Sequence, residues 1–280
     1  DVARWAYPSI ERLVTQTLTP AEGEEEMAWV KQIENRTKNA LQQFQLQARL
    51  LRSVLTPNCV ILKFAGSASL TVEQVKRRRS EFLTTHGLSL ISIQPESGVV
   101  SLAIERPTRR VIMTQELWAR WRPATAEGCQ ELLIGMREDD GELLMLSPGT
   151  QAPHTLIAGS TGSGKSVLMQ NIILGVVATN TPRQARIVLI DPKQGVDYFQ
   201  FEHLPHLKGG IIDDQKRASQ ELEALVEEMD SRYAMLRAAR VPNLTAYNQR
   251  VSEQDRIPVI WLVHDEFAEW MLVEDYKEHV

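Results

Sequence analysis

The stretch with the most chemical content is Gly159-Ser160-Thr161-Gly162-Ser163-Gly164-Lys165-Ser166. It satisfies every fixed position of the phosphate-binding pattern G-x-x-x-x-G-K-[ST]. Glycines allow consecutive backbone N–H groups to turn inward around an anion, and a helix that begins there adds its positive end. We expect the eight residues to bind ATP, with Lys165 on the β- and γ-phosphates and Ser166 on Mg²⁺.

The residues around this loop support a phosphate site. The apolar run from His154 to Ala158 predicts a buried parallel strand that ends at the first glycine. From Lys165 onward, apolar residues recur at helical spacing: Val167, Leu168, Ile172, Ile173, Val176 and Val177. A Gly/Ser-rich linker without a ligand is the alternative, but a linker needs neither Lys-Ser at its end nor an apolar strand in front.

A second run supplies the acidic half of a nucleotide site. Five consecutive apolar residues, Val259 to Val263, predict a strand covered on both faces, and Asp265 and Glu266 follow where it leaves the sheet. We expect Asp265 to hold the Mg²⁺ shell, and Glu266 to orient and activate the attacking water. The alternative is an ordinary solvated pair of acids at a strand end. The presence of the phosphate loop in the same chain favours the nucleotide site.

Two neighbouring features are less decisive. His264, just before the acids, has two interpretations: a group that supports the site from behind, or a structural histidine at a strand end. A further apolar strand over Arg186–Ile190 is stopped by Pro192, so Asp191 and Lys193 should emerge at the carboxyl edge. Ligands of open α/β sheets bind at that edge.

The composition is that of a globular protein and sets limits on function. The chain has 280 residues, 43% hydrophobic and 24% charged, which excludes a disordered class. It shows neither a run long enough for a membrane span nor a signal pattern, so we expect a cytoplasmic protein. Cys59 and Cys129 are far apart, as expected of reduced thiols rather than a disulfide framework or metal site.

The charge distribution gives mild evidence about nucleic acid. A net charge of −5 argues against an extended phosphate-binding footprint. Local basic groups exist at Lys76-Arg77-Arg78-Arg79 and at Arg106, Arg109 and Arg110. On a helix the first run spreads around the circumference, so a solvated face is one interpretation and a DNA contact the other.

Three segments are expected along the chain. Residues 1–56 predict helices, one beginning at Thr19-Pro20 and continuing in one or two pieces to Thr56. Residues 57–121 predict a small α+β subdomain, with strands over 60–64, 88–93, 99–104 and 109–113 and a helix over 70–86. Residues 122–280 alternate strand and helix around the phosphate loop, which predicts an α/β core with a parallel sheet.

Several motifs together resemble those of the FtsK/SpoIIIE DNA translocases. Besides the phosphate loop, the matching segments are Ile190-Asp191-Pro192-Lys193, Pro205-His206-Leu207, Met229-x-x-Arg232-Tyr233, Asn243-Leu244-x-x-Tyr247-Asn248 and Asp265-Glu266-Phe267-Ala268. They occur in the family's order and spacing. Residues 60–118 also look like the small subdomain that precedes the motor core, so the resemblance covers about residues 40 to 280.

This resemblance implies a RecA-like ATPase that assembles as a hexameric ring and pumps double-stranded DNA through its channel. Gly159, Gly162, Gly164, Lys165 and Ser166 would bind ATP and Mg²⁺, Asp265 would be the second metal acid, and Glu266 the catalytic base. Such rings also use an arginine across the subunit interface, which no motif here identifies.

The resemblance also has departures, and these leave the biological role open. His264 stands where the family usually has an aliphatic residue, and the sequence ends about fifteen residues after the acids, before the family's sensor strand and DNA-facing loops. We therefore expect a fragment of a longer protein.

A soluble restriction or defence motor with nuclease subunits is our slight preference among the possible roles. The alternatives are an ATP-gated assembly switch, a segregation, export or conjugation motor, and, least favoured, a small-molecule P-loop kinase.

Overall fold

The structure is a computed structural model that describes residues 20–108, 110–123, 128–137, 141–149, 153–271 and 276. They divide into two compact units. One holds the residues up to Trp121 together with Ile134–Met145, and the other holds Arg122–Leu133 and the residues from Leu146 onward.

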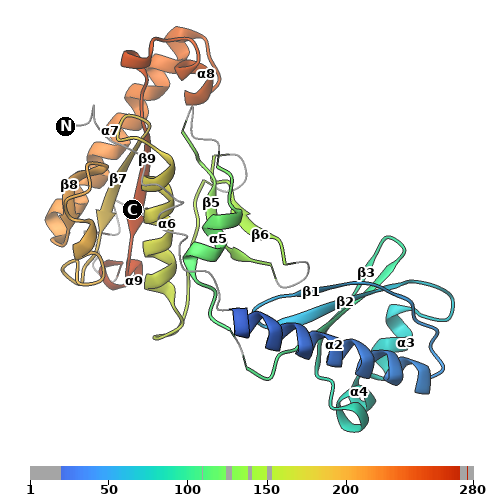
Figure 1. Cartoon of the computed structure of the whole chain (residues 1–280). Helices are drawn as coiled ribbons and strands as arrows, with labels where there is room; N and C mark the ends of the chain where they lie inside the picture. The colour runs from blue at the N-terminus through green and yellow to red at the C-terminus, as the bar shows by residue number, and fades with distance from the viewer. Residues whose placement is uncertain are drawn as a thin grey trace. The chain divides into compact units, whose positions relative to one another are not determined.

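The first unit is built on an antiparallel sheet in the order β1-β2-β4-β3. Its strands are β1 (Leu50–Leu55), β2 (Cys59–Ala65), β3 (Leu90–Glu96) and β4 (Val99–Glu105). Three helices pack against one face: α2 (Pro20–Gln43), α3 (Val72–Arg77) and α4 (Arg79–His86) (Figure 1). Thr71 caps α3 through a reciprocal pair of hydrogen bonds with Gln74, so the helix begins where the sequence predicts.

The core of this unit lies between the helices and the sheet. Alternate residues of the strands point inward, as the period of two requires. The buried cluster joins Ile33 and Leu41 of α2 to Leu62 of β2 and Leu102 of β4, with Phe82 of α4. The N-terminal helix therefore shares its core with the sheet.

Three predictions about this unit are corrected by the structure. Residues 50–55 form the edge strand β1, not a helix, because they pair with β2, and Leu50 and Leu55 pack against the core. The predicted strand over 109–113 is absent from residues 110–113, after which α5 (Thr114–Arg120) begins; Arg109 lies outside the described residues, as does Thr19. The single helix over 70–86 breaks at Arg78. The limits 57–121 for the subdomain stay a prediction, but its sheet begins before residue 57.

The second unit contains a parallel sheet in the order β8-β7-β9. Its strands are β7 (Ala185–Ile190), β8 (Leu207–Ile212) and β9 (Val259–His264), and its longer helices are α6 (Lys165–Thr179) and α7 (Gln215–Ala239). The remaining elements of this unit are α8 (Leu244–Asn248), α9 (Phe267–Trp270) and short 3-10 turns at Phe199–Phe201 and Glu253–Asp255. The strands β5 (Leu132–Met136) and β6 (Leu143–Leu146) pair with each other, and most of both strands belongs to the first unit. Asp214 caps α7 by accepting a hydrogen bond from the backbone N–H of Arg217.

Two sequence predictions fail around the parallel sheet. His154–Ala158 does not form a strand, and Leu156 is 82% exposed. A strand needs a hydrogen-bonding neighbour, and the described residues pair none with this run. The strand β9 forms, but it is not covered on both faces as expected, since Leu262 is 45% exposed.

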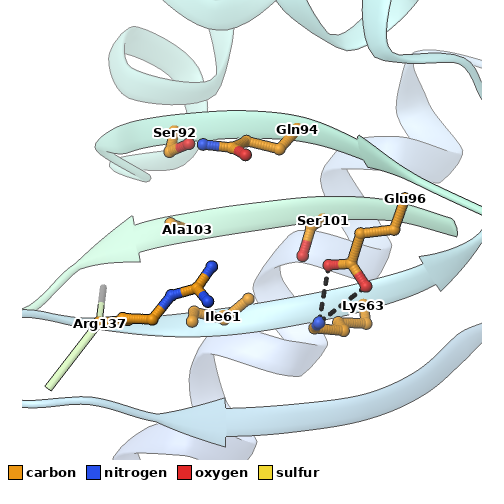
Figure 2. Close-up of a pocket in the computed structure, with 8 residues that line it drawn as sticks. All are labelled: Ile61, Lys63, Ser92, Gln94, Glu96, Ser101, Ala103 and Arg137. Atoms are coloured by element: carbon orange, nitrogen blue, oxygen red, sulfur yellow. Dashed lines mark hydrogen bonds and ion pairs between the residues drawn. The ribbon is translucent and has the colours of Figure 1, made fainter. Parts of the chain in front are cut away.

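On the face of the antiparallel sheet away from the helices lies a small polar cavity of about 170 Å³ (Figure 2). Cross-strand neighbours Lys63 and Ser101 form part of its floor, and Arg137 lies at its rim. The Lys63 side chain is only 5% exposed and binds both carboxylate oxygens of Glu96, at 2.6 and 2.8 Å. Lys63 thereby lowers the pKa of Glu96.

This ion pair predicts acid sensitivity of the first unit. Because the folded pKa of Glu96 lies below its ordinary value, the pair stabilises the fold above that value, and the stability is lost as pH falls through the folded pKa. Glu96→Gln should lower the stability at neutral pH by about 1–2 kcal/mol, since it leaves Lys63 buried without its partner while Glu96 itself is partly solvated. The stability of the variant should also fall less steeply than that of the wild type as the pH is lowered. Hydrogen exchange of the β2 and β4 amides measures both effects.

The matched control is Glu73→Gln, which removes an exposed helical pair with Lys76. Equal exchange rates in the two variants at every pH would contradict the role of Glu96.

Candidate nucleotide site

The phosphate loop lies at the start of α6, and its glycines are required by the backbone. Gly162 and Gly164 have φ angles of +80° and +93°, a region that residues with a Cβ rarely adopt, and the space beside each is open. Gly159 differs from them: a Cβ there would lie 2.3 Å from the Ser163 hydroxyl, so a larger residue would require the Ser163 side chain to rotate. The helix begins at Lys165, as predicted.

The acidic residues are brought to this loop by the register of the parallel sheet. Ile190 of β7 pairs with His264 of β9, so Asp191 and Asp265 follow side by side at the carboxyl edge. The Asp265 N–H donates to the Ile190 carbonyl at 2.9 Å. Asp265 is 4% exposed.

Lys165 joins the loop to the acids. Its ammonium group lies 2.5 Å from Oδ1 of Asp265 and 3.2 Å from Oε1 of Glu266. Burial lowers the pKa of Lys165, but the hydrogen bonds to these two carboxylates outweigh burial and raise it overall. Three residues that the sequence assigns to one site therefore meet in the structure.

Glu266 is held by a second cation. Lys193 lies 2.5 Å from the same oxygen, Oε1, and its hydrogen bond is the largest cause of the lowered pKa of Glu266, followed by that of Lys165. The backbone of Glu266 has φ +43°, in the left-handed region, which is strained for a residue with a side chain. Such strain is common at functional sites. The predicted emergence of Lys193 at the carboxyl edge is confirmed.

The loop that follows β7 contributes contacts that sequence reasoning missed. The Ser166 hydroxyl donates to Oδ2 of Asp197 at 3.1 Å, and the Tyr198 hydroxyl donates to Oδ2 of Asp265 at 2.6 Å. Burial raises the pKa of Asp265, but hydrogen bonds from Lys165 and Tyr198 outweigh it and lower the pKa overall. The one available signal was position, since this loop starts at the carboxyl edge of the sheet.

His264 contacts the backbone carbonyl of Asp265 and not a carboxylate. Its Nδ1 lies 2.9 Å from the Asp265 carbonyl oxygen and its Nε2 lies 2.7 Å from the Tyr276 hydroxyl. Burial lowers the pKa of His264, which favours the neutral ring. A neutral ring with its proton on Nδ1 donates to the carbonyl and accepts from Tyr276, so both nitrogens are satisfied.

Other motif residues hold the elements that carry the site. Arg232 of α7 donates to the Pro258 carbonyl at 2.9 Å, and Asn248 forms two hydrogen bonds with the backbone of Ile257. Both contacts fix the chain just before β9. His206 contacts the Asn180 carbonyl at 2.8 Å and so connects the end of α6 to the start of β8.

The donor set fits a magnesium nucleotide. Open space beside Gly162 and Gly164 lets backbone N–H groups face a phosphate. Lys165 supplies an ammonium group, while Ser166 and Asp265 supply the oxygen ligands that Mg²⁺ prefers. The residues that the sequence assigns to ATP and Mg²⁺ are thus of the right chemical types.

Comparison with known proteins identifies the family. A model of the FtsK/SpoIIIE family matches residues 117–279, which include the phosphate loop, Lys193, Asp265 and Glu266. The chain belongs to the FtsK/SpoIIIE family. The resemblance seen in the motifs is therefore confirmed.

Individual FtsK/SpoIIIE relatives are longer than this chain. The DNA translocase FtsK of Corynebacterium efficiens is 30% identical over 203 residues, covering 68% of this chain and 21% of the relative. The DNA translocase FtsK of Sporosarcina ureae is 27% identical over 239 residues, covering 82% and 30%. The chain thus spans less than a third of either relative.

A solved structure shows the same fold. The pCW3 conjugation coupling protein TcpA, solved as a monomer with ATPγS, has a TM-score of 0.50 and 21% identity, covering 88% of this chain and 69% of that chain. The α/β fold with a RecA-like core and parallel sheet is therefore confirmed. In the part of the chain that the structure describes, no helix is long and apolar enough to cross a membrane.

The Lys165 contacts predict a large effect on nucleotide binding. Lys165→Ala should weaken ATP binding roughly 10- to 100-fold, because hydrogen bonds to charged groups contribute about 1.5–3 kcal/mol. Isothermal titration calorimetry measures the change. Lys208→Ala, which removes an ion pair with Glu221 elsewhere in the unit, is the control; an equal affinity in both variants would refute the site.

Proposed function

We propose that this chain is the ATP-driven motor segment of a double-stranded DNA translocase. The observation that carries the proposal is the convergence of Lys165, Asp265 and Glu266, in which the Lys165 ammonium group contacts both carboxylates at 2.5 and 3.2 Å. A phosphate loop beside a paired carboxylate at a strand end is the arrangement of ATP-hydrolysing P-loop proteins. Membership of the FtsK/SpoIIIE family and relatives named DNA translocase support the coupling to DNA.

Each residue receives a role from its chemistry. The backbone of Gly159 to Gly164 and the Lys165 ammonium group bind the phosphates, which requires Lys165 to leave the carboxylates. Ser166 and Asp265 hold Mg²⁺, which when bound neutralises charge on the phosphates. Glu266 orients the attacking water and accepts its proton. Lys193 remains against Glu266 and keeps its carboxylate charged.

We do not assign the DNA contact surface to the basic run Lys76–Arg79. Arg78 pairs with Glu81 at 2.9 Å and lies over the Phe44 ring, and Arg79 donates to the Leu90 carbonyl at 2.9 Å. These contacts favour the solvated, structural interpretation of the run. DNA binding is proposed instead for the assembled form, a homo-hexameric ring in the cytoplasm, which the family resemblance supports. A restriction or defence pathway stays a prediction.

Glu266→Gln should separate binding from turnover. The amide keeps the size of the side chain but cannot accept the proton, so ATP binding should persist while hydrolysis falls roughly 10²-fold or more. The assay is ATP hydrolysis by the full-length protein with and without linear double-stranded DNA. Glu269→Gln, three residues further on and exposed, should retain wild-type turnover.

DNA dependence decides between the candidate functions. A translocase should hydrolyse ATP faster when double-stranded DNA is added. Hydrolysis that is lost in Glu266→Gln but indifferent to DNA would overturn the translocase proposal and favour an ATP-gated assembly switch.

A further inference from the structure

The loop after β7 folds back onto both halves of the nucleotide site. Two adjacent residues make the contacts: Asp197 accepts from Ser166 of the phosphate loop, and Tyr198 donates to Asp265 after β9. The path of the loop is tightly specified. Asp191 accepts from the Lys193 N–H at 3.0 Å, and Gly195, at φ +70°, lies so close to Ile211 that a Cβ would approach it to 3.1 Å.

Tyr198 is positioned by packing as well as by its hydroxyl. The residue is fully buried, and its ring lies 6.4 Å from that of Phe201. Its N–H donates to the Gly195 carbonyl at 2.8 Å. A side chain held at both ends in this way has little rotational freedom, so its hydroxyl presents a fixed donor.

The Asp265 carboxylate has different partners on its two oxygens. Oδ1 accepts from Lys165 and from the N–H of Glu266, while Oδ2 accepts from Tyr198 at 2.6 Å. Lys165 is the partner that a nucleotide would draw away. The Tyr198 bond uses the other oxygen and does not depend on Lys165.

A second carboxylate makes this bond important. Asp191 is 1% exposed, and its Oδ2 has no hydrogen-bond partner among the described residues. Burial raises the pKa of Asp191, and the negative charge of Asp265 raises it further. Without the Tyr198 donor, Asp265 would have a buried oxygen without a donor near a second acid, a costly arrangement.

We propose that Tyr198 is a positioning residue of the magnesium site, which fixes the orientation of the Asp265 carboxylate through Oδ2 and leaves Oδ1 directed at the phosphate loop. This inference rests on the proposed role of Asp265 as a magnesium ligand. Tyr198 itself touches neither metal nor nucleotide. Its loss should therefore affect the magnesium-dependent part of nucleotide binding and spare the rest.

The test compares ATPγS binding in EDTA and in Mg²⁺ by calorimetry on the full-length protein. Tyr198→Phe removes one oxygen and keeps the buried ring, so the EDTA affinity should stay near wild type, while the melting temperature should fall because Asp265 loses a buried donor. The gain in affinity on adding Mg²⁺ should fall about 10-fold, near the lower end of what a hydrogen bond to a charged group contributes, because Tyr198 acts through Asp265. Tyr233→Phe, on an exposed residue of α7, is the control and should behave as wild type.

A double variant tests whether Tyr198 acts through Asp265. In an Asp265→Asn background, Tyr198→Phe should cause little further loss of the magnesium-dependent gain, because the two changes remove one interaction. Independent, multiplicative losses would overturn the proposal. So would an unchanged gain in Tyr198→Phe, or an equal loss in EDTA and in Mg²⁺. A wild-type protein whose ATPγS affinity does not respond to Mg²⁺ would instead refute the proposed function itself.

Discussion

The bond between the Lys165 ammonium group and the Asp265 carboxylate is the interaction on which the rest of the site depends. It connects the start of α6 to the end of β9 across 100 positions of sequence. Two features of the fold make it possible: the glycine backbone that delivers Lys165 at the first turn of the helix, and the parallel register that places Asp265 beside β7. Lys193, Asp197 and Tyr198 then attach the loop after β7 to the site, through Glu266, Ser166 and Asp265 respectively.

This arrangement concentrates negative charge at the place where the protein must later bind negatively charged phosphates. Asp191, Asp265 and Glu266 follow two neighbouring strands, and two lysines offset them. A buried carboxylate is tolerated only when hydrogen bonds satisfy it, which Asp265 achieves on both oxygens. Binding of a phosphate must compete for Lys165, so the contacts that remain on Asp265 and Glu266 determine whether the acids stay in place.

The sequence predicted the parts of this picture that local pattern controls. The phosphate loop, α6, β7 and the acids after β9 follow from glycine positions, apolar runs and helical spacing. Elements that depend on pairing between distant strands were not predictable. Leu50–Leu55 is a strand because it pairs with β2, and His154–Ala158 has no pairing strand among the described residues. Tyr198 carried no signal beyond the position of its loop, since its hydrogen bond joins it to a residue 67 positions later in the chain. The functional roles of the site residues stay predictions.

The central claim is that ATP hydrolysis at this site moves the protein along DNA. Displacement of a third strand from a DNA triplex by the full-length protein measures that movement directly. The account predicts ATP-dependent release of the third strand, with a delay that lengthens as the triplex lies further from the duplex end. DNA-stimulated hydrolysis with the third strand left in place at every distance would contradict it.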